Sequence, residues 1–338
     1  MSHKNGVLLL NLGGPETLAD VRPFLYKLFS DPEIIRIKNP VFRRLLAWII
    51  SWTREKKSQN LYRQIGGGSP LRRITESQAA ALETALADLG TPTRVYVGML
   101  CGKPSIDEAF NSVIADGIAR LTLLPLFPQY SRTTTGACFR HIHTLVRRRK
   151  LSEKIEISFI EDWYKNTLYI DVITDMISTG LARFPENERM DVHILYSAHS
   201  LPERYIQEGD PYLDRTRECV SFINDRLKGR FNIVADYSLA FQSKIGPVKW
   251  VKPSVEEILR DLAQRNVRKI LAVPVSFVSD HIETLYELDI EYGKLAVDLG
   301  ITEFHRAESL NTNPQFIAAL ANVAASRRQW LAASPDIS

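Results

Sequence analysis

The chain has 338 residues and a formal net charge of +4, and 45% of its residues are hydrophobic while 24% are charged. This length predicts two domains or one large one, and the composition is that of an ordinary globular protein. The small positive balance does not indicate nucleic-acid binding. Three cysteines lie far apart and form no CxxC pair, which argues against a disulfide framework and a cysteine zinc site and fits a reducing compartment.

The N-terminal apolar run is too short for a signal peptide, and the chain has no run of about 18 apolar residues that could span a membrane. We therefore expect a cytoplasmic protein. The nucleotide-binding patterns GxGxxG and GxxxxGKS/T and the hydrolase pattern GxSxG are absent. The sequence thus predicts neither a phosphate-binding loop nor a serine nucleophile.

Apolar segments typical of strands alternate along the chain with segments typical of helices. Strands are predicted over residues 6–12, 94–99, 120–127, 154–160, 192–196, 232–239 and 269–273. Helices are predicted over residues 74–89, 135–149, 167–184, 212–227 and 314–333, and after the capping serines Ser105 and Ser254. This alternation predicts an α/β fold with parallel sheets covered by helices.

Two stretches of the chain share the same order of features. Residues 119–136 and 268–285 both run from an apolar strand through a proline and a polar loop into a helix. We interpret them as parts of two similarly built halves divided near residue 160. The predicted organisation is an N-terminal domain over 1–160, a C-terminal domain over 161–310 and a terminal helix over 311–338.

One early segment, Ile34 to Lys57, does not fit a simple core element. Large apolar residues precede a group of bases in it: Leu45, Leu46, Trp48, Ile49, Ile50 and Trp52, then Arg54, Lys56 and Lys57. This composition is typical of a helix that lies in a membrane interface. A core or interdomain helix with a basic end is the alternative, and composition alone leaves both open.

The stretch from residue 273 to 292 begins as a buried strand and becomes dense in acids. If this part is helical, Glu283, Glu287 and Glu291 share one face, because residues four apart are neighbours on a helix. Large apolar residues between the acids argue against a plain solvated face. Carboxylates at the end of a buried strand lie where α/β proteins place their sites, and such a row suits a cation or departing protons.

His199 follows the predicted strand over residues 192–196, so it also lies at the ligand-binding edge of a parallel sheet. A histidine with one carboxylate can bind a divalent cation weakly or take part in proton transfer. These ligands are too few for a closed zinc site. A purely structural histidine is the alternative.

Ordered motifs over nearly the whole chain resemble the ferrochelatase family. They are LLLNLGGPET (8–17), QIGGGSP (64–70), FPQYS (127–131), YSAHSLPERYIQEGDPY (196–212), FQSKIGP (241–247) and SDHIETLYELDIEY (279–292). The resemblance implies two Rossmann-like, chelatase-type domains, each a parallel sheet flanked by helices, with the active-site cleft between them. It implies an enzyme, a lyase that inserts Fe²⁺ into protoporphyrin IX to form protohaem, the terminal step of haem biosynthesis.

The same resemblance implies the site residues. His199 and Glu283 match the family's central histidine and glutamate and would bind the metal and remove pyrrole protons. The expected proton or metal path consists of Glu287, Glu291, Asp280 and His281. A porphyrin needs an apolar slot, and its wall candidates, each of which could equally be a core residue, are Leu12, Phe127, Tyr130 and Trp250.

The resemblance also defines the expected partners. Protoporphyrin IX and Fe²⁺ are substrates, no cofactor is required, and nucleic acid is not a partner. The family's apolar lip at the cleft mouth matches residues 34–57, which implies peripheral contact of a cytoplasmic enzyme with the membrane surface.

Some positions depart from the pattern of animal members. Leu100 and Cys101 replace an Arg-Tyr pair, so a role for that pair does not carry over. Arg132 replaces a cluster-ligating cysteine, and the cysteine-bearing C-terminal extension is absent, so an iron–sulfur cluster of the animal type is not expected. The PQYS form favours protoporphyrin. The alternatives are a coproporphyrin ferrochelatase, a cobalt chelatase, or a haem or porphyrin carrier with His199 as axial ligand, although a carrier has no use for the acidic row.

Overall fold

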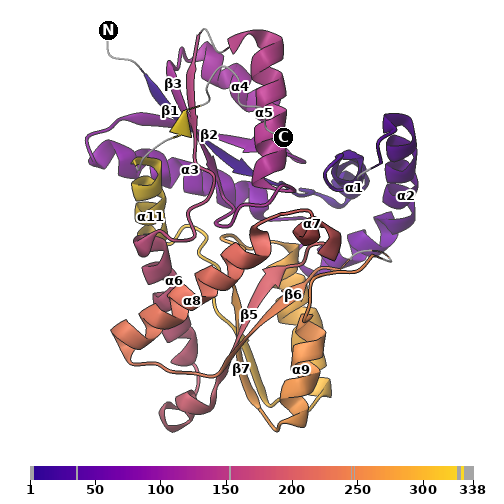
Figure 1. Ribbon diagram of the computed structural model, residues 1–338, viewed down its shortest axis with the longest axis vertical. Coiled ribbons are helices and arrows are strands. Elements are labelled where there is room, and N and C mark those ends of the chain that lie inside the picture. The colour runs from indigo at the N-terminus through magenta and orange to yellow at the C-terminus, as the bar shows by residue number, and fades with distance from the viewer. Residues whose placement is uncertain are drawn as a thin grey trace. The chain divides into compact units, whose positions relative to one another are not determined.

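The computed structural model describes residues 4–35, 37–151, 154–244, 246, 248–325 and 329–330. The chain divides into two compact units, which can be followed in Figure 1. The first unit comprises Met1–Trp163 and Ile317–Ser338, and the second comprises Tyr164–Phe316. Each contains a sheet flanked by helices, which confirms the predicted fold class.

The first unit is built on a five-stranded sheet in the order β2-β1-β3-β4-β9. Its strands are β1 (Asn5–Asn11), β2 (Thr93–Met99), β3 (Arg120–Pro125), β4 (Glu156–Phe159) and β9 (Gln329–Trp330). All pairs are parallel except the pair of β4 and β9. The apolar run of β1 is buried on both faces, as expected of a parallel strand covered by helices.

The helices of the first unit follow the strands in sequence. They are η1 (Leu18–Asp20), α1 (Val21–Ser30), α2 (Pro40–Gln64), α3 (Leu71–Asp88), α4 (Ile106–Ala115) and α5 (Thr135–Arg149). Helix α11 (Pro314–Ala325) begins at the end of the second unit and continues into the first.

The second unit is built on a four-stranded parallel sheet in the order β6-β5-β7-β8. Its strands are β5 (His193–His199), β6 (Tyr237–Gln242), β7 (Lys269–Pro274) and β8 (Glu303–Arg306). Its helices are α6 (Thr167–Leu181), η3 (Glu186–Asp191), α7 (Glu203–Gln207), α8 (Tyr212–Phe231), α9 (Val255–Gln264), the π-helix η4 (Glu283–Tyr292) and α10 (Gly293–Asp298).

The register of this sheet brings polar residues together at one edge. His199 ends β5 and pairs with Gln242, which ends β6, while Ser197 pairs with Pro274 at the end of β7. Because the strands are parallel, the segments that follow them leave the sheet at the same edge, where open α/β sheets bind ligands.

Several predicted boundaries are corrected by the structure. Strand β5 runs through His199 instead of ending at Tyr196, because residues 197–199 continue to pair with β6. Strand β6 begins at Tyr237 instead of residue 232, because α8 continues to Phe231 and Asn232 caps it in a left-handed conformation with φ 54°. Short strand β8 was not predicted.

The predicted terminal helix over 311–338 is too long. Helix α11 ends at Ala325, and Gln329–Trp330 forms a strand that pairs with the edge of β4 instead of continuing the helix. Residues 326–328 and 331–338 lie outside the described part of the chain.

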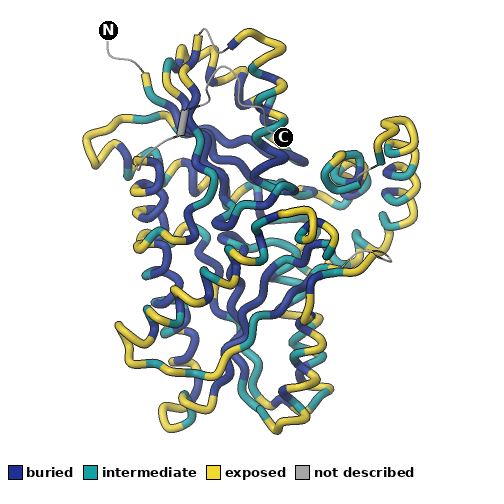
Figure 2. The backbone as a smooth tube through the Cα atoms, in the orientation of Figure 1, coloured by how far each residue is buried: buried dark blue, intermediate teal, exposed yellow. Residues whose placement is uncertain are grey.

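Helix α2 carries an exposed apolar face. Its buried residues are Ala47, Ser51 and Tyr62, whereas large apolar side chains remain open to solvent: Val41, Phe42, Leu45, Trp48, Ile49 and Trp52. Figure 2 shows how much of this helix is exposed. Trp48 is 50% and Trp52 is 60% exposed, so neither belongs to a packed core. No helix in the described residues is long and apolar enough to cross a membrane.

The predicted capping serines are confirmed. Ser105 and Ser254 are the N-caps of α4 and α9, and each forms a capping box with the glutamate three residues on. Ser254→Ala should lower the free energy of unfolding by about 1 kcal/mol, because the Glu257 amide loses its acceptor. Urea unfolding measures this loss. Ser221→Ala, at an exposed position within α8, is the matched control and should be nearly neutral, and equal effects of the two substitutions would contradict the capping role.

Candidate active site

His199 is held in place by both neighbouring strands. Its backbone continues the pairing of β5 with β6, and its amide donates to the Ser276 hydroxyl, 3.0 Å away, just after β7. The imidazole is therefore presented at the edge of the sheet from a fixed backbone. This position agrees with the expectation that His199 lies at the ligand-binding edge, although it is the last residue of the strand and not the residue beyond it.

His199 and Glu283 form a close pair. Nδ1 of His199 lies 2.8 Å from Oε2 of Glu283, in the first turn of η4. The imidazole side chain is 37% exposed and the carboxylate only 16%. Because an ionised carboxylate can only accept, Nδ1 is the donor, and Nε2 of the neutral ring is left as the nitrogen that can take a proton or a metal.

Burial and charge shift the pKa values of His199 and Glu283 in opposite directions. Burial lowers the pKa of His199, but the charge of Glu283 and the hydrogen bond to it outweigh burial and leave the pKa raised. Burial raises the pKa of Glu283, but the charge of His199 and the hydrogen bond from it outweigh burial and leave this pKa well below its usual range. Glu283 therefore stays ionised beside an imidazole that readily holds a proton.

Glu287 lies next along the helix and is held by two donors from the end of β6. The Ser243 hydroxyl donates to its Oε2 at 2.6 Å and Nε2 of Gln242 at 3.0 Å, while the same Gln242 nitrogen lies 2.9 Å from the Glu283 carbonyl. Burial and then the charge of Glu283 raise the pKa of Glu287. Two carboxyls one turn apart thus favour opposite protonation states, which is the arrangement expected of proton-transfer groups.

A second imidazole completes the cluster. Nδ1 of His281 donates to the Ser279 carbonyl at 3.0 Å, and its Nε2 lies 4.0 Å from Oε1 of Glu283. Burial lowers the pKa of His281, which keeps the ring neutral. The ring of Phe277 lies 4.5 Å from the His281 ring and 6.4 Å from the His199 ring, measured between centroids. The two imidazoles therefore share an apolar neighbour.

The acidic segment is a π-helix of ten residues. Most π-helical segments are single turns inside α-helices, and many lie at functional sites. Along this one, Glu283 and Glu287 are partly buried, whereas Glu291 is exposed. The acidic row therefore runs from the strand ends to solvent.

The structure brings several of the predicted residues together within the second unit. His199, Glu283, Glu287 and His281 form one cluster, and Glu291 continues the row. The wall candidates lie in both units and are all partly buried: Leu12, Phe127 and Tyr130 in the first and Trp250 in the second. Among the described residues, no group of three or more histidine, cysteine, aspartate or glutamate side chains is arranged to hold a metal.

Sequence reasoning missed Gln242 and Ser243 as members of the site. Both lie in the FQSKIGP motif, and the signal was the placement of polar residues at the end of a buried strand. Ser243 has φ 67°, an uncommon conformation for a residue other than glycine, which turns the chain at the point where its hydroxyl reaches Glu287.

A solved structure shares the fold of this chain. The chain is similar to the crystal structure of the sirohydrochlorin chelatase SirB from Bacillus subtilis subspecies spizizenii in complex with cobalt, with a TM-score of 0.53 and 14% identity, over 95% of this chain and 94% of that one. This likeness concerns the fold alone.

The sequence comparisons identify the family. The Ferrochelatase family model matches residues 4–328. The ferrochelatase of Gloeobacter violaceus is 49% identical over 319 residues, which cover 94% of this chain and 96% of that protein. The ferrochelatase of Gloeothece citriformis is 47% identical over 319 residues, with 94% and 81% covered. The chain belongs to the ferrochelatase family, as its motifs predicted, and is an enzyme of iron insertion into porphyrin.

The contact of Ser243 with Glu287 can be tested by a substitution that removes the Ser243 hydroxyl. Ser243→Ala should lower kcat for porphyrin metallation by about fivefold to tenfold, because a hydrogen bond to a carboxyl group is worth roughly 1 to 1.5 kcal/mol. Steady-state kinetics measure the change. Ser238→Ala is the matched control, since Ser238 lies at the opposite end of β6 with its hydroxyl 3.0 Å from His193. An unchanged kcat in Ser243→Ala would show that this contact does not serve the reaction.

Proposed function

We propose that this chain inserts Fe²⁺ into protoporphyrin IX to form protohaem, with His199 and Glu283 as the residues that bind the metal and remove the pyrrole protons. The observation that carries the assignment of roles is the 2.8 Å contact between the His199 imidazole and the Glu283 carboxylate. Membership of the ferrochelatase family supports the reaction. The PQYS motif, at 128–131, supports protoporphyrin as the porphyrin.

The reaction sets three requirements on the site. Fe²⁺ must lose water, two pyrrole N–H protons must leave, and the metal must enter the plane of the four nitrogens. Nε2 of His199 can accept a pyrrole proton near neutral pH. The ionised carboxylate of Glu283 stabilises the cation as water is removed, and imidazole and carboxylate both suit a divalent first-row metal.

The protons then need a route to solvent. Glu287, with its raised pKa, can hold a proton near neutral pH and release it. Glu291 lies further along the same helix and is exposed. Neutral His281 lies beside Glu283, and its Nε2 can accept a proton that passes through the site. In this scheme the acidic row carries protons outward, or the metal inward, one helical turn at a time.

The roles of the central pair can be tested by two substitutions. His199→Ala and Glu283→Gln should each lower kcat by about a hundredfold or more, because each removes a proton-transfer or charge-bearing group. Absorbance of haem formed from Fe²⁺ and protoporphyrin under anaerobic conditions measures the rate. His141→Ala is the matched control, since His141 of α5 lies 2.6 Å from Asp107 of α4 in an exposed pair and the substitution should leave the rate unchanged. Near-normal turnover of either site variant would overturn the assignment.

The same assay separates the competing functions. Protoporphyrin should be metallated faster than coproporphyrin, and Fe²⁺ should be accepted. Faster metallation of coproporphyrin would reassign the porphyrin, and a preference for Co²⁺ would reassign the metal. Tight binding of haem without any turnover would indicate a carrier.

We further propose that α2 docks the enzyme on a membrane surface. Its exposed apolar face supports this, because contiguous exposed apolar patches mark interaction sites. Lys56 and Lys57 are exposed one turn beyond Trp52, where bases near an anionic surface contribute about 1 kcal/mol each. Without a spanning segment in the described residues, binding should be reversible and weakened by salt.

Replacing both tryptophans tests the docking surface. The variant Trp48→Ser with Trp52→Ser should bind anionic vesicles at least tenfold more weakly in a sedimentation assay, while its melting temperature changes little. Leu89→Ser with Met190→Ser is the control, because both side chains are 64% exposed and lie outside α2. Unchanged vesicle binding together with a collapsed melting temperature would mean that the tryptophans stabilise the fold and do not meet lipid.

A further inference from the structure

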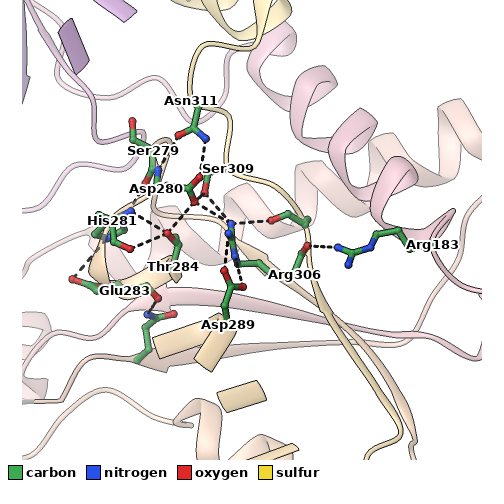
Figure 3. Close-up of polar contacts among 12 residues, drawn as sticks. Arg183, Ser279, Asp280, His281, Glu283, Thr284, Asp289, Arg306, Ser309 and Asn311 are labelled. Carbon is green, nitrogen blue, oxygen red and sulfur yellow. Dashed lines mark hydrogen bonds and ion pairs between the residues drawn. The ribbon is translucent and has the colours of Figure 1, made fainter. Parts of the chain in front are cut away.

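Arg306, at the end of β8, holds the π-helix η4 from outside the site (Figure 3). Its Nε and Nη2 donate to the two carboxylate oxygens of Asp289 at 2.7 and 2.9 Å, a fork-to-fork pair. Its Nη1 lies 3.2 Å from Oδ1 of Asp280 and donates to the Ser309 hydroxyl at 3.1 Å. The Arg306 side chain is only 12% exposed. One guanidinium thus joins two carboxylates that flank Glu283 in the sequence.

Asp280 is fully engaged in this network. Its Oδ1 accepts from the hydroxyl of Ser309 at 2.7 Å and from that of Thr284 at 3.1 Å, and its Oδ2 accepts from Nδ2 of Asn311 at 2.8 Å. Its own amide donates to Oδ1 of Asn311 at 2.9 Å. The pKa of Asp280 is lowered, because these hydrogen bonds and Arg306 outweigh burial. Such a carboxylate is suited to anchoring the chain and poorly suited to passing on a proton.

The spacing of the two aspartates matters for the winding of the helix. Asp289 lies within η4, whereas Asp280 lies three positions before its first residue, so the two carboxylates connect the entry of the helix to its body. The hydrogen bonds of a π-helix reach one residue further than those of an α-helix, so the position of Asp289 around the helix axis depends on the winding of the residues before it. Because Asp280 precedes the helix, its attachment to Arg306 also fixes how the chain enters η4.

A short chain of contacts leads from this clamp to the reacting groups. Thr284 is buried, and its hydroxyl, which contacts Asp280, accepts from the His281 amide at 3.0 Å. Glu283 lies between His281 and Thr284, and its carboxylate points to His199 at 2.8 Å. The clamp therefore restrains the backbone on both sides of Glu283.

We propose that Arg306 is a positioning residue for Glu283: by joining Asp280 to Asp289 it sets the winding of η4, and this winding directs Glu283 and Glu287 toward His199 and Gln242. The inference rests on the proposed role of Glu283. It assigns Asp280 to the anchor of the helix and leaves Glu287 and Glu291 as the proton or metal path.

The test compares substitutions of Arg306 with a matched control in the same unit. Arg306→Met should lower kcat for metallation of protoporphyrin by about tenfold or more while KM for the porphyrin stays within about twofold, since small displacements of a reacting group are costly. Arg230→Met is the control, because Arg230 of α8 likewise pairs with two aspartates, Asp171 and Asp175 of α6. It should keep kcat near that of the wild type. Rates are taken well below the melting temperature of each protein.

A charge-free variant separates positioning from stability. Arg306→Met alone leaves two carboxylates without their partner, which destabilises the fold by itself. Combining it with Asp280→Asn and Asp289→Asn removes both unpaired negative charges and should restore the melting temperature. The kcat of this triple variant should stay low, because Arg306 no longer joins residue 280 to residue 289. If Arg306→Met fails to fold, Asp289→Asn takes its place and should likewise lower kcat. This variant should fold, since the Asp289 side chain is 37% exposed and asparagine has the same shape.

The outcomes distinguish this inference from the proposed function. If the wild type does not metallate protoporphyrin, or if Glu283→Gln remains active, the proposed function fails. If the wild type is active and Glu283→Gln is not, but folded Arg306→Met or the charge-free variant keeps kcat within about twofold of the wild type, the positioning role is overturned. An equal loss in Arg230→Met would also overturn it, because the effect would then be general to the unit.

Discussion

The hydrogen bond between His199 and Glu283 is the contact on which the site depends. A carboxylate with a side-chain exposure of 16% is costly to ionise, and the imidazole 2.8 Å away offsets that cost. The pair can form only if the end of β5 and the first turn of η4 meet. Strand pairing holds the first partner, with Ser276 fixing the His199 amide, and the network around Arg306 holds the second.

The acids of η4 and its entry differ sharply in their surroundings. Asp280 and Asp289 share the single positive charge of Arg306, whereas Glu283 pairs with an imidazole and Glu287 accepts from the neutral donors Gln242 and Ser243. The two aspartates therefore stabilise the structure, and the two glutamates remain able to exchange protons or bind a cation. A single segment supplies both sets because its side chains face in different directions around a wide helix.

Much of the fold follows from local patterns in the sequence. The alternation of apolar strands and helices, and the capping boxes at Ser105 and Ser254, depend on neighbouring residues and were predictable. The position of His199 at a sheet edge followed from the strand before it. The π winding of η4 and the clamp of Arg306 were not predictable, because they depend on contacts between residues 17 and 26 positions apart. Gln242 and Ser243 were missed because their strand ends at Gln242, three residues beyond its predicted end.

The most direct test of the account is to locate a metal on the protein without porphyrin. Zn²⁺ can stand in for Fe²⁺, and anomalous diffraction from crystals soaked in it shows where it binds. The account predicts a peak within bonding distance, about 2.0–2.2 Å, of the His199 imidazole or the Glu283 carboxylate, and loss of that peak in Glu283→Gln crystals. Binding that involves neither residue, for example at the surface pair of His141 and Asp107 alone, would contradict it.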